Sequence, residues 1–182
     1  MNDRPNFHVI TGGPGSGKTT IIAALRAAGH ACVDEVGRAI TRQQMAIGGP
    51  ATHGRDPVAF RELMLSAMIR DFEAAVSRGP VFFDRGIPGL VGYCRLIGVP
   101  VPDHLRRAAA LYRYGRRIFV TPPWPEIYRG DAERKQDFDE AVRTYQAVVG
   151  GCSEAGYEVV EIPRAPLPAR VAFVLDAVAG AA

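Results

Sequence analysis

The sequence predicts an α/β fold in which a parallel sheet of five strands is covered by helices on both faces. Five short apolar segments alternate along the chain with stretches whose apolar residues have helical spacing, the pattern of a three-layer α/β/α architecture. The 182 residues, 47% of them hydrophobic, are enough for one well-cored domain and too few for two full-sized ones. We therefore expect a single domain over residues 1–182.

The first expected strand, residues 7–10, leads into a glycine-rich segment that reads Thr-Gly-Gly-Pro-Gly-Ser-Gly-Lys-Thr-Thr over residues 11–20. This segment matches the phosphate-binding template of Gly, four free positions, Gly, Lys and then Ser or Thr. A helical pattern follows over residues 21–28, so the order of strand, loop and helix is the one that a P-loop (Walker A motif) requires. A glycine-rich turn that only links strand to helix is the disfavoured alternative.

Each residue type in this loop has a physical role toward a nucleotide. Glycines let main-chain N–H groups approach phosphate oxygens, and the helix N-terminus adds unsatisfied donors and the positive end of its dipole. Lys18 is expected to bridge the outer phosphates and Thr19 to bind Mg²⁺. The sequence thus predicts a site for Mg-ATP, with GTP left open, formed by Gly13, Pro14, Gly15, Ser16, Gly17, Lys18, Thr19 and Thr20.

Two further apolar segments end in acidic residues. Residues 31–33 precede Asp34 and Glu35, and residues 81–83 precede Asp84 and Arg85. In open parallel sheets ligands gather at the carboxyl ends of the strands. Glu35 or Asp34 is therefore a candidate general base for an acceptor hydroxyl, and Asp84 is a candidate Walker B ligand of Mg²⁺. Helix capping is the structural alternative for these acids.

Arg85 occupies the position where motor-type ATPases usually carry a Glu that polarises the attacking water. This disfavours direct water activation by that route. Arg38, in the first turn of the helix expected after Glu35, fits either a phosphate contact or a pairing with Glu35.

The middle of the chain offers candidates for acceptor binding. A loop rich in Gly and Pro, residues 47–57, carries His53 and Arg55, and it fits an acceptor-binding loop or an ordinary surface loop. Helices are expected over residues 58–78, 89–97 and 103–112, with Tyr93 and Arg95 on the second. A basic cluster fits a solvated surface better than a nucleic-acid groove; it consists of Arg106, Arg107, Arg113, Arg116 and Arg117.

The fourth expected strand, residues 118–120, ends in a proline-rich turn, and the segment from about 124 to 136 is expected to form a lid. Arg134, and after it Arg129, would bring positive charge to the outer phosphates in the transition state. Mutual pairing of these charges on a helix surface is the alternative. A helix over 137–149, a strand over 156–163 and a helix over 167–178 complete the chain, with Arg164 in the loop where a nucleotide base would lie.

Several of these stretches together resemble the small bacterial P-loop proteins classed as AAA-family ATPases, a family that includes the nicotinamide riboside kinase domain. The stretches are residues 10–20, Glu35 with Arg38, residues 82–88 and residues 122–135. The similarity spans nearly the whole chain and extends more faintly to deoxynucleoside and thymidylate kinases. It implies a kinase-like fold with strand order 2-3-1-4-5.

The resemblance also implies roles for individual residues. It assigns Lys18 and Thr19 to the binding of phosphate and magnesium. It assigns Glu35 and Asp84 to the positions of the general base and the metal ligand. Arg129 and Arg134 would belong to a mobile lid. Where many relatives carry an Asp after the Asp-Arg-Gly-x-Pro run, this chain has Gly89, so the acceptor contact made by that Asp is not expected here.

The leading functional hypothesis is a kinase that transfers the γ-phosphoryl group of Mg-ATP to a small hydroxyl-bearing, nucleoside-like acceptor. A nucleotide-dependent switch or slow NTP hydrolase stays open, as does a polynucleotide 5′-hydroxyl kinase. The net charge of +3 falls short of the basic blocks of a dedicated nucleic-acid binder. Three widely spaced cysteines and no apolar run of signal-peptide or membrane length indicate a reduced, cytoplasmic protein.

Overall fold

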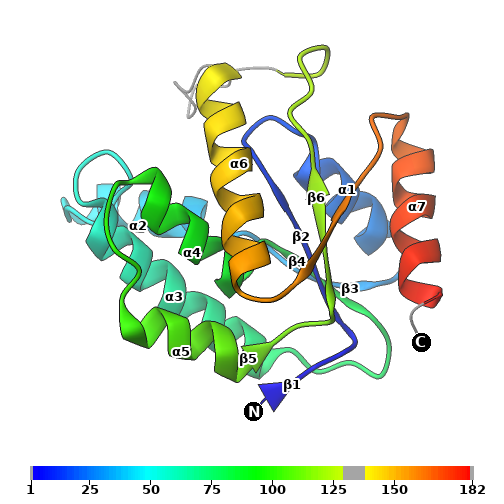
Figure 1. The fold of residues 1–182 in the computed structure, drawn as a ribbon, viewed down its shortest axis with the longest axis horizontal. Coiled ribbons are helices and arrows are strands. Elements are labelled where there is room, and N and C mark those ends of the chain that lie inside the picture. Colours follow the sequence, from blue (N-terminus) through cyan, green and yellow to red (C-terminus); the bar gives the residue numbers. More distant parts are fainter. Residues whose placement is uncertain (1, 129–137, 181–182) are drawn as a thin grey trace.

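The computed structural model describes residues 2–128 and 138–180, in which a five-stranded parallel sheet lies between two layers of helices (Figure 1). The strand order is β3-β4-β2-β6-β7. In space these strands are β3 (Ala31–Val33), β4 (Val81–Asp84), β2 (Phe7–Gly12), β6 (Arg117–Thr121) and β7 (Glu158–Glu161). Numbered along the chain within this sheet, the order is 2-3-1-4-5. The predicted fold class and strand order are therefore confirmed.

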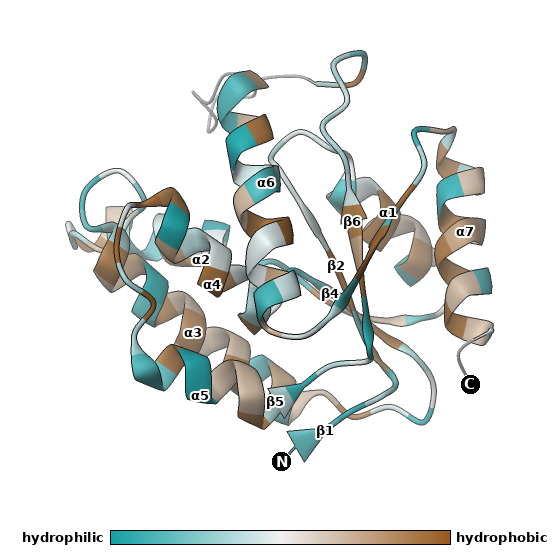
Figure 2. Ribbon diagram, viewed as in Figure 1, coloured by the Kyte–Doolittle hydropathy of each residue, from teal (hydrophilic) through white to brown (hydrophobic). Residues whose placement is uncertain are grey.

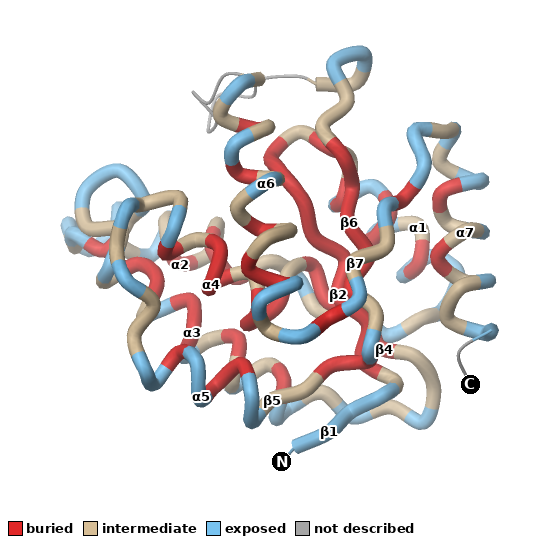
Figure 3. The backbone as a smooth tube through the Cα atoms, viewed as in Figure 1, coloured by how far each residue is buried: buried red, intermediate tan, exposed pale blue. Residues whose placement is uncertain are grey.

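The central strands are buried on both faces because their side chains alternate between two hydrophobic cores. Ile10, Phe82 and Phe119 belong to one core, whereas their neighbours Val9 and Phe83 belong to the other. Every residue of β2 is buried, as the red central tube in Figure 3 shows. Figure 2 shows the same strands as apolar, which explains why their sequence reads as continuous hydrophobic runs.

Two helices cover the first face of the sheet: α1 (Lys18–Ala27) and α7 (Leu167–Ala179). The layer on the other face is larger (Figure 1). It contains α2 (Val36–Ala46), α3 (Pro57–Ala74), α4 (Ile87–Leu96), α5 (Asp103–Leu111) and α6 (Phe138–Glu154). None of the helices within residues 2–128 and 138–180 combines the length and apolar character of a membrane span.

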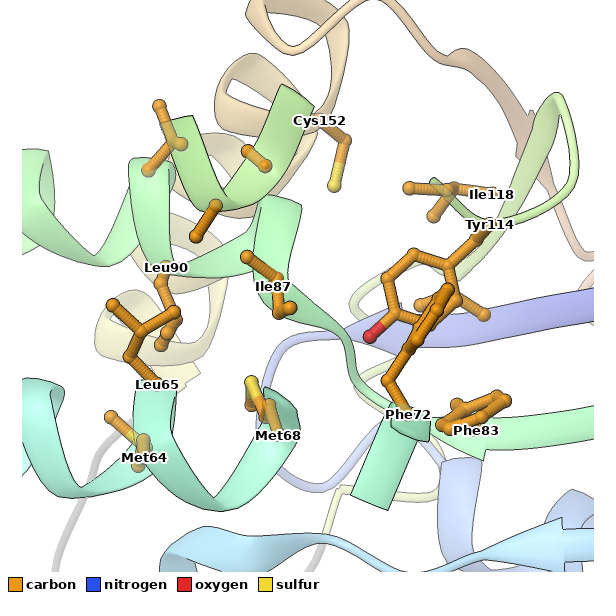
Figure 4. Close-up of a cluster of buried hydrophobic side chains, with 14 of the residues drawn as sticks. Met64, Leu65, Met68, Phe72, Phe83, Ile87, Leu90, Tyr114, Ile118 and Cys152 are labelled. Carbon is orange, nitrogen blue, oxygen red and sulfur yellow. The ribbon is translucent and has the colours of Figure 1, made fainter. Parts of the chain in front are cut away.

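Aromatic contacts fix α3 on the sheet. The ring of Phe72 lies edge-on to Tyr114 at a centroid distance of 5.0 Å and to Phe7 at 5.1 Å. Tyr114 also packs against Phe83 of β4 at 5.3 Å (Figure 4). Edge-to-face pairs of this kind add to the free energy gained by burying the rings.

Two helix ends differ from the sequence-based prediction by four residues or more. The helix predicted over residues 58–78 ends at Ala74 because Ala75 has extended backbone angles. The following loop is held by the Asn6 side chain, which donates to the carbonyl oxygen of Gly79 at 3.0 Å. A short parallel ladder, β1 (Asn2–Asp3) with β5 (Tyr112–Arg113), was also not predicted, since strands of two residues leave no periodic pattern.

The second difference concerns α6, which continues past the predicted end at residue 149 to Glu154. Gly150 and Gly151 suggest a helix stop, but the helix runs through them. A β-carbon on Gly151 would overlap the main chain of Gly92 in α4, and one on Gly92 would overlap the carbonyl of Ala147 in α6. These glycines therefore allow close packing of two helices, which overrides their low helix propensity.

Candidate active site

The P-loop connects β2 to α1 at the carboxyl edge of the sheet. Its turn needs left-handed backbone at Gly15 and Gly17, whose φ angles are 69° and 81°. Lys18 is buried, and its ammonium donates to the carbonyl oxygen of Gly13 at 2.5 Å and to Ser16 Oγ at 3.3 Å. Burial lowers the pKa of Lys18 to about 7, and the charge of Arg85 is the second-largest cause of this shift. An anionic ligand beside this ammonium would stabilise its charged form.

Contacts from β6 hold the loop in place. The Ser16 hydroxyl lies 2.7 Å from the carbonyl oxygen of Gly13 and 2.6 Å from Thr121 Oγ1 at the end of β6. Gly12 has a φ of 140°, and a β-carbon there would come within 2.5 Å of the main-chain oxygen of Thr121. The loop is thus anchored to two neighbouring strands before any ligand binds.

An arginine of α7 also contacts the loop. Arg170 is buried, and its Nη2 donates to the carbonyl oxygen of Ser16 at 2.9 Å. Its guanidinium lies 5.7 Å from the ring centre of Trp124, and its Nε is buried without a hydrogen-bond partner in the described residues. Burial lowers the pKa of Arg170. The Nε–H group of Arg170 is available as a hydrogen-bond donor to a ligand.

Arg170 is absent from the sequence-based prediction. The only signal that could have revealed it is a charged residue on the buried stripe of α7, four positions before Val174. The pattern of that helix is otherwise that of an ordinary closing helix.

Glu35 lies between β3 and α2 and accepts a hydrogen bond from Arg85 Nε at 3.1 Å. Arg38 Nε lies 3.9 Å from its other oxygen. Burial alone would raise the pKa of Glu35, but the charges of Arg85, Lys18 and Arg38 outweigh it and hold the pKa below its ordinary value. The carboxylate is therefore ionised at neutral pH and can accept hydrogen bonds.

Arg85 donates hydrogen bonds both to this carboxylate and to the start of the P-loop. Its Nη1 donates to the carbonyl oxygen of Gly12 at 3.3 Å, and its main chain has a φ of 74°. A left-handed backbone is uncommon for a residue with a side chain and concentrates at functional sites. The turn after β4 thereby directs the Arg85 side chain toward Glu35 and Gly12.

Asp84, the last residue of β4, is buried, and its Oδ1 has no hydrogen-bond partner among the described residues. Burial raises the pKa of Asp84, opposed in part by the charges of Lys18 and Arg85. A buried carboxylate oxygen without a partner fits a magnesium ligand or a partner for magnesium-bound water. Thr19, at the exposed start of α1, supplies a second oxygen.

This donor set suits Mg²⁺ held jointly by protein and nucleotide. No group of three His, Cys, Asp or Glu side chains arranged to hold a metal occurs in the part of the chain that the structure describes. Mg²⁺ is usually bound by one or two protein oxygens together with phosphate and water, so a dedicated cage is not required.

Two cavities flank the P-loop and meet at Glu35 and Arg38, which line both. The first, here called the Trp124 cavity, has a volume of about 490 Å³ and is lined by residues 15–20, 165–167, Glu35, Arg38, Trp124, Ile127 and Arg170. The second, the Tyr93 cavity, has a volume of about 920 Å³ and lies among α2, α3, α4 and α6. Thr11, Pro14 and Arg85 mark its P-loop end.

Residues of the 47–57 loop contribute to the Tyr93 cavity. His53 Nδ1 lies 2.7 Å from the Tyr93 hydroxyl, and both residues line the cavity together with Arg55. Gly89 lines it as well, and a β-carbon there would meet no atom within 4 Å. The space that an Asp would fill at this position is therefore open.

Other candidate residues lie apart from the cavities or outside the described residues. Asp34 is exposed, accepts a hydrogen bond from Arg26 at 2.7 Å and lines neither cavity. Arg164 is exposed and lines neither cavity. Arg129 and Arg134 lie outside the described residues, as does most of the predicted lid.

Three of the five arginines of the basic cluster pair with carboxylates of the protein. Arg106 contacts Glu154 at 3.0 Å, and Arg116 and Arg117 each lie 3.4 Å from Glu158. Arg117 is the first residue of β6, so these residues lie at the amino edge of the sheet, opposite the P-loop. The cluster does not extend the candidate site.

Comparisons with known proteins agree with the geometry. A family model described as an AAA domain matches residues 7–170. No curated protein matches the chain significantly. Among solved structures, NadR protein in complex with NR is similar with a TM-score of 0.69 and 20% identity, over 98% of this chain and 51% of that one. The chain thus spans about half the length of NadR.

Two kinases match over nearly their whole lengths. Thymidylate kinase from Ehrlichia chaffeensis has a TM-score of 0.64 at 13% identity, over 98% of this chain and 100% of that one. Deoxyadenosine kinase from M. mycoides has a TM-score of 0.67 at 12% identity, over 96% and 99%. At these identities the likeness shows the fold, which is that of P-loop kinases. Because the family model covers most of the chain, including the P-loop and both acidic strand ends, the chain belongs to this family of AAA domains.

Proposed function

We propose that the chain is a kinase that transfers the γ-phosphoryl group of Mg-ATP or Mg-GTP to a hydroxyl group of a small molecule. One observation supports this most strongly: Glu35 lines both the Trp124 cavity, which includes the P-loop, and the much larger Tyr93 cavity. A carboxylate at the junction of a phosphate site and a second cavity is where phosphoryl transfer needs a base.

In this proposal the nucleotide occupies the P-loop and the Trp124 cavity. Main-chain N–H groups of residue 13 and residues 15–20, together with the Lys18 ammonium, bind the phosphates. The nucleobase of the nucleotide would lie near Trp124 and Arg170. The Nε of Arg170, which has no partner among the described residues, offers a hydrogen-bond donor to the nucleobase. Arg164 is not needed for this placement.

Thr19 and Asp84 would hold Mg²⁺ together with the outer phosphates. When bound, the ion neutralises charge on the phosphates and orients them for attack. The buried, unpartnered oxygen of Asp84 supports this role.

Glu35 would accept the proton of the acceptor hydroxyl. The acceptor oxygen forms a bond to the γ-phosphorus, the bond from this phosphorus to the bridging oxygen breaks, and its electrons leave with the nucleoside diphosphate. Arg85 and Arg38 hold the carboxylate of Glu35 in position before the acceptor arrives. Arg134 and Arg129 stay as predicted lid residues that would neutralise charge in the transition state.

The alternatives receive less support. A hydrolase would need no acceptor site, but the carboxylate of Glu35 lines a second cavity that is much larger than the one at the P-loop. A polynucleotide kinase would need the arginine cluster as a strand groove, yet three of its members contact carboxylates at the far edge of the sheet.

Replacement of Glu35 by Gln tests the proposal. Turnover of Mg-ATP or Mg-GTP is measured with a panel of alcohols, nucleosides and 5′-hydroxyl oligonucleotides. We expect acceptor-dependent turnover that falls roughly 100-fold or more in Glu35→Gln, since a positioned base contributes about this factor, while nucleotide affinity is retained. Asp34→Asn is the matched control and should keep full activity. Turnover that needs no acceptor, or that survives in Glu35→Gln, would contradict the proposal.

A further inference from the structure

Helix α2 extends along the Tyr93 cavity from the P-loop end to a far end. It contributes side chains at a helical spacing of three or four positions: Glu35 at its N-cap, Arg38, Arg42 and Met45. Glu35 marks the P-loop end, because it lines the Trp124 cavity as well. Arg42 follows Glu35 by seven residues, which corresponds to roughly 10 Å along a helix axis. The cavity therefore continues well beyond the proposed site of phosphoryl transfer.

Apolar side chains of α3 line the cavity between these two ends. Phe60, Met64 and Met68 belong to this wall and are buried; the two methionines are drawn in Figure 4. A β-carbon on Gly37 would lie 3.5 Å from Met64 Sδ and 3.5 Å from Phe60 Cζ. The apolar wall therefore lies beside the first turn of α2, where the body of an acceptor would pack.

Two arginines at the far end have no carboxylate partner among the described residues: Arg42 of α2 and Arg55 of the 47–57 loop. Both side chains are exposed. Arg55 Nη1 donates to the carbonyl oxygen of Gly49 at 3.3 Å, and the N–H of Gly49 donates to the carbonyl oxygen of Gln44 at 2.8 Å. These hydrogen bonds hold the Arg55 guanidinium beside the last turn of α2, the turn that follows Arg42.

Positive charge in the lining exceeds negative charge. The described lining holds one carboxylate, Glu35, and four arginines: Arg38, Arg42, Arg55 and Arg85. Arg85 and Arg38 lie 3.1 Å and 3.9 Å from the carboxylate of Glu35. Glu140 lies 4.0 Å from His53 Nε2 but does not line the cavity. The charge at the far end is therefore not balanced by the described lining, and guanidinium groups bind carboxylates and phosphates through paired hydrogen bonds.

Two buried hydroxyls give separate evidence for a ligand in this cavity. Thr11 Oγ1 and Thr144 Oγ1 belong to the lining, and neither has a hydrogen-bond partner among the described residues. Thr11 lies in β2 just before the P-loop, and Thr144 lies in α6. A buried hydroxyl without a partner costs free energy that a polar ligand would recover.

We infer that the acceptor alcohol carries an anionic group, a phosphate or a carboxylate, at the end opposite its reactive hydroxyl. This inference rests on the proposed function and names its acceptor class. The hydroxyl faces Glu35, and the body of the acceptor packs against Phe60 and Met64. The anionic group accepts hydrogen bonds from Arg42 and Arg55. The cavity volume of about 920 Å³ is within the range of small-molecule sites.

The test uses three alcohols built on one rigid ring system: 6-(hydroxymethyl)-2-naphthoic acid, 6-(hydroxymethyl)-2-naphthyl phosphate and the neutral 6-(hydroxymethyl)-2-naphthamide. Titration calorimetry measures the binding of each to the full chain with Mg-ADP present. We expect at least one anionic alcohol to bind about tenfold or more tightly than the amide, through charged hydrogen bonds. The tighter of the two identifies carboxylate or phosphate as the group recognised. An amide that binds as tightly as both anions, or no binding of either anion, would overturn the inference.

Two variants test the location. Arg42→Gln and Arg55→Gln should each weaken binding of the tighter anionic alcohol roughly tenfold, the lower end of the range for charged hydrogen bonds because both side chains are exposed. Affinity for the neutral amide should not change, whereas a variant that only disturbed the loop or α2 would weaken binding of both ligands.

Arg107→Gln is the matched control, since it removes the same charge from an exposed arginine of α5 that lines neither cavity. Its effect on the anionic alcohol should stay within about twofold, because solvent and salt screen a distant charge. Unchanged affinity in both cavity variants, or an equal loss in Arg107→Gln, would overturn the inference.

Phosphorylation of the same alcohols with Mg-ATP and Mg-GTP separates this inference from the proposed function. If Mg-nucleotide binds and neutral alcohols are phosphorylated as well as the anionic ones, only the acceptor class is wrong. If no Mg-nucleotide binds, or no alcohol of either class is phosphorylated, the proposed function itself fails.

Discussion

The role of Arg170 is best tested by comparing a ligand that has a nucleobase with one that consists of phosphates alone. It contacts the P-loop through Ser16 and faces Trp124 in the cavity where we place the nucleotide base. A residue that reads the base should matter for a nucleotide and not for inorganic tripolyphosphate, which has no base. A residue that only stiffens the P-loop should affect both ligands equally.

We predict that Arg170→Lys weakens binding of Mg-ATP or Mg-GTP roughly tenfold, because lysine keeps the charge but loses the planar set of donors. Affinity for magnesium tripolyphosphate should stay within about twofold. Titration calorimetry measures both ligands. Arg164→Lys is the matched control, since Arg164 is an exposed arginine that lines neither cavity. A parallel loss of both affinities in Arg170→Lys would assign it a structural role only.

At single residues, the sequence is informative where a motif fixes both residue type and position. Lys18, Thr19, Glu35 and Asp84 are predicted because they follow strands that parallel-sheet topology brings to one edge. Arg170 is not, because its contact with Ser16 joins residues 154 positions apart. The pairing of Glu35 with Arg85, 50 positions apart, is likewise visible only in the folded chain.

At the scale of elements, the contact between α4 and α6 sets the shape of the Tyr93 cavity. Gly92 and Gly151 let the two main chains approach more closely than any side chain would allow. The same helices supply Leu90, Thr144 and Val148 to the cavity lining. The distance between α4 and α6 therefore depends on the absence of a side chain at Gly92 and Gly151.

Gly151→Ala should lower the free energy of unfolding by about 1–3 kcal/mol or more, because its methyl group would overlap the main chain of Gly92. Urea denaturation followed by circular dichroism measures this. Gly150→Ala is the matched control on the same helix, where the added β-carbon meets the terminal nitrogen of the flexible Arg95 side chain at 2.9 Å. It should be neutral or stabilising by up to about 1 kcal/mol. Equal effects of the two changes would refute the close-packing explanation.

Element boundaries were less predictable than element types. Helix type for α3 and α6 follows from apolar spacing, but their ends depend on tertiary contacts. Asn6, just before β2, donates a hydrogen bond to the loop after α3. In α6, Gly151 packs closely against Gly92 of α4, where the helix continues past residue 149. Such contacts override local propensity, which is why the predicted ends at residues 78 and 149 were wrong.

For the whole molecule, one buried histidine makes stability depend on pH. His8 of β2 is buried beside Phe82 at a ring distance of 5.7 Å, and burial lowers its pKa. The unfolded chain then binds a proton more readily than the folded one. This contribution to stability is complete above the unfolded pKa of about 6.5 and is lost as pH falls below it.

We therefore expect the free energy of unfolding to decrease between pH 7 and pH 5, with a slope due to His8 of at most about 1.4 kcal/mol per pH unit. His8→Phe should remove this part of the slope, since phenylalanine cannot take up a proton. Urea denaturation of both proteins at several pH values measures the difference. Identical slopes for the two proteins would show that His8 does not contribute.

The fold of the whole molecule was predictable because three signals agreed: five apolar strands, the alternating helices and the P-loop. The strand order followed from resemblance and is confirmed by the pairing of the strands. The two cavities were not predictable, because each is formed by residues from at least four separate segments. Composition and periodicity carry no information on how such segments meet.

The account as a whole depends on a P-loop that binds a metal-bound triphosphate through Lys18. Titration calorimetry with Mg-ATP and Mg-GTP, on the natural chain and on Lys18→Ala of verified fold, tests this most directly. We predict saturable binding of at least one nucleotide to the natural chain, weakened roughly 10- to 100-fold in Lys18→Ala through loss of a charged hydrogen bond. No binding to the natural chain, or equal affinity in both proteins, would contradict it.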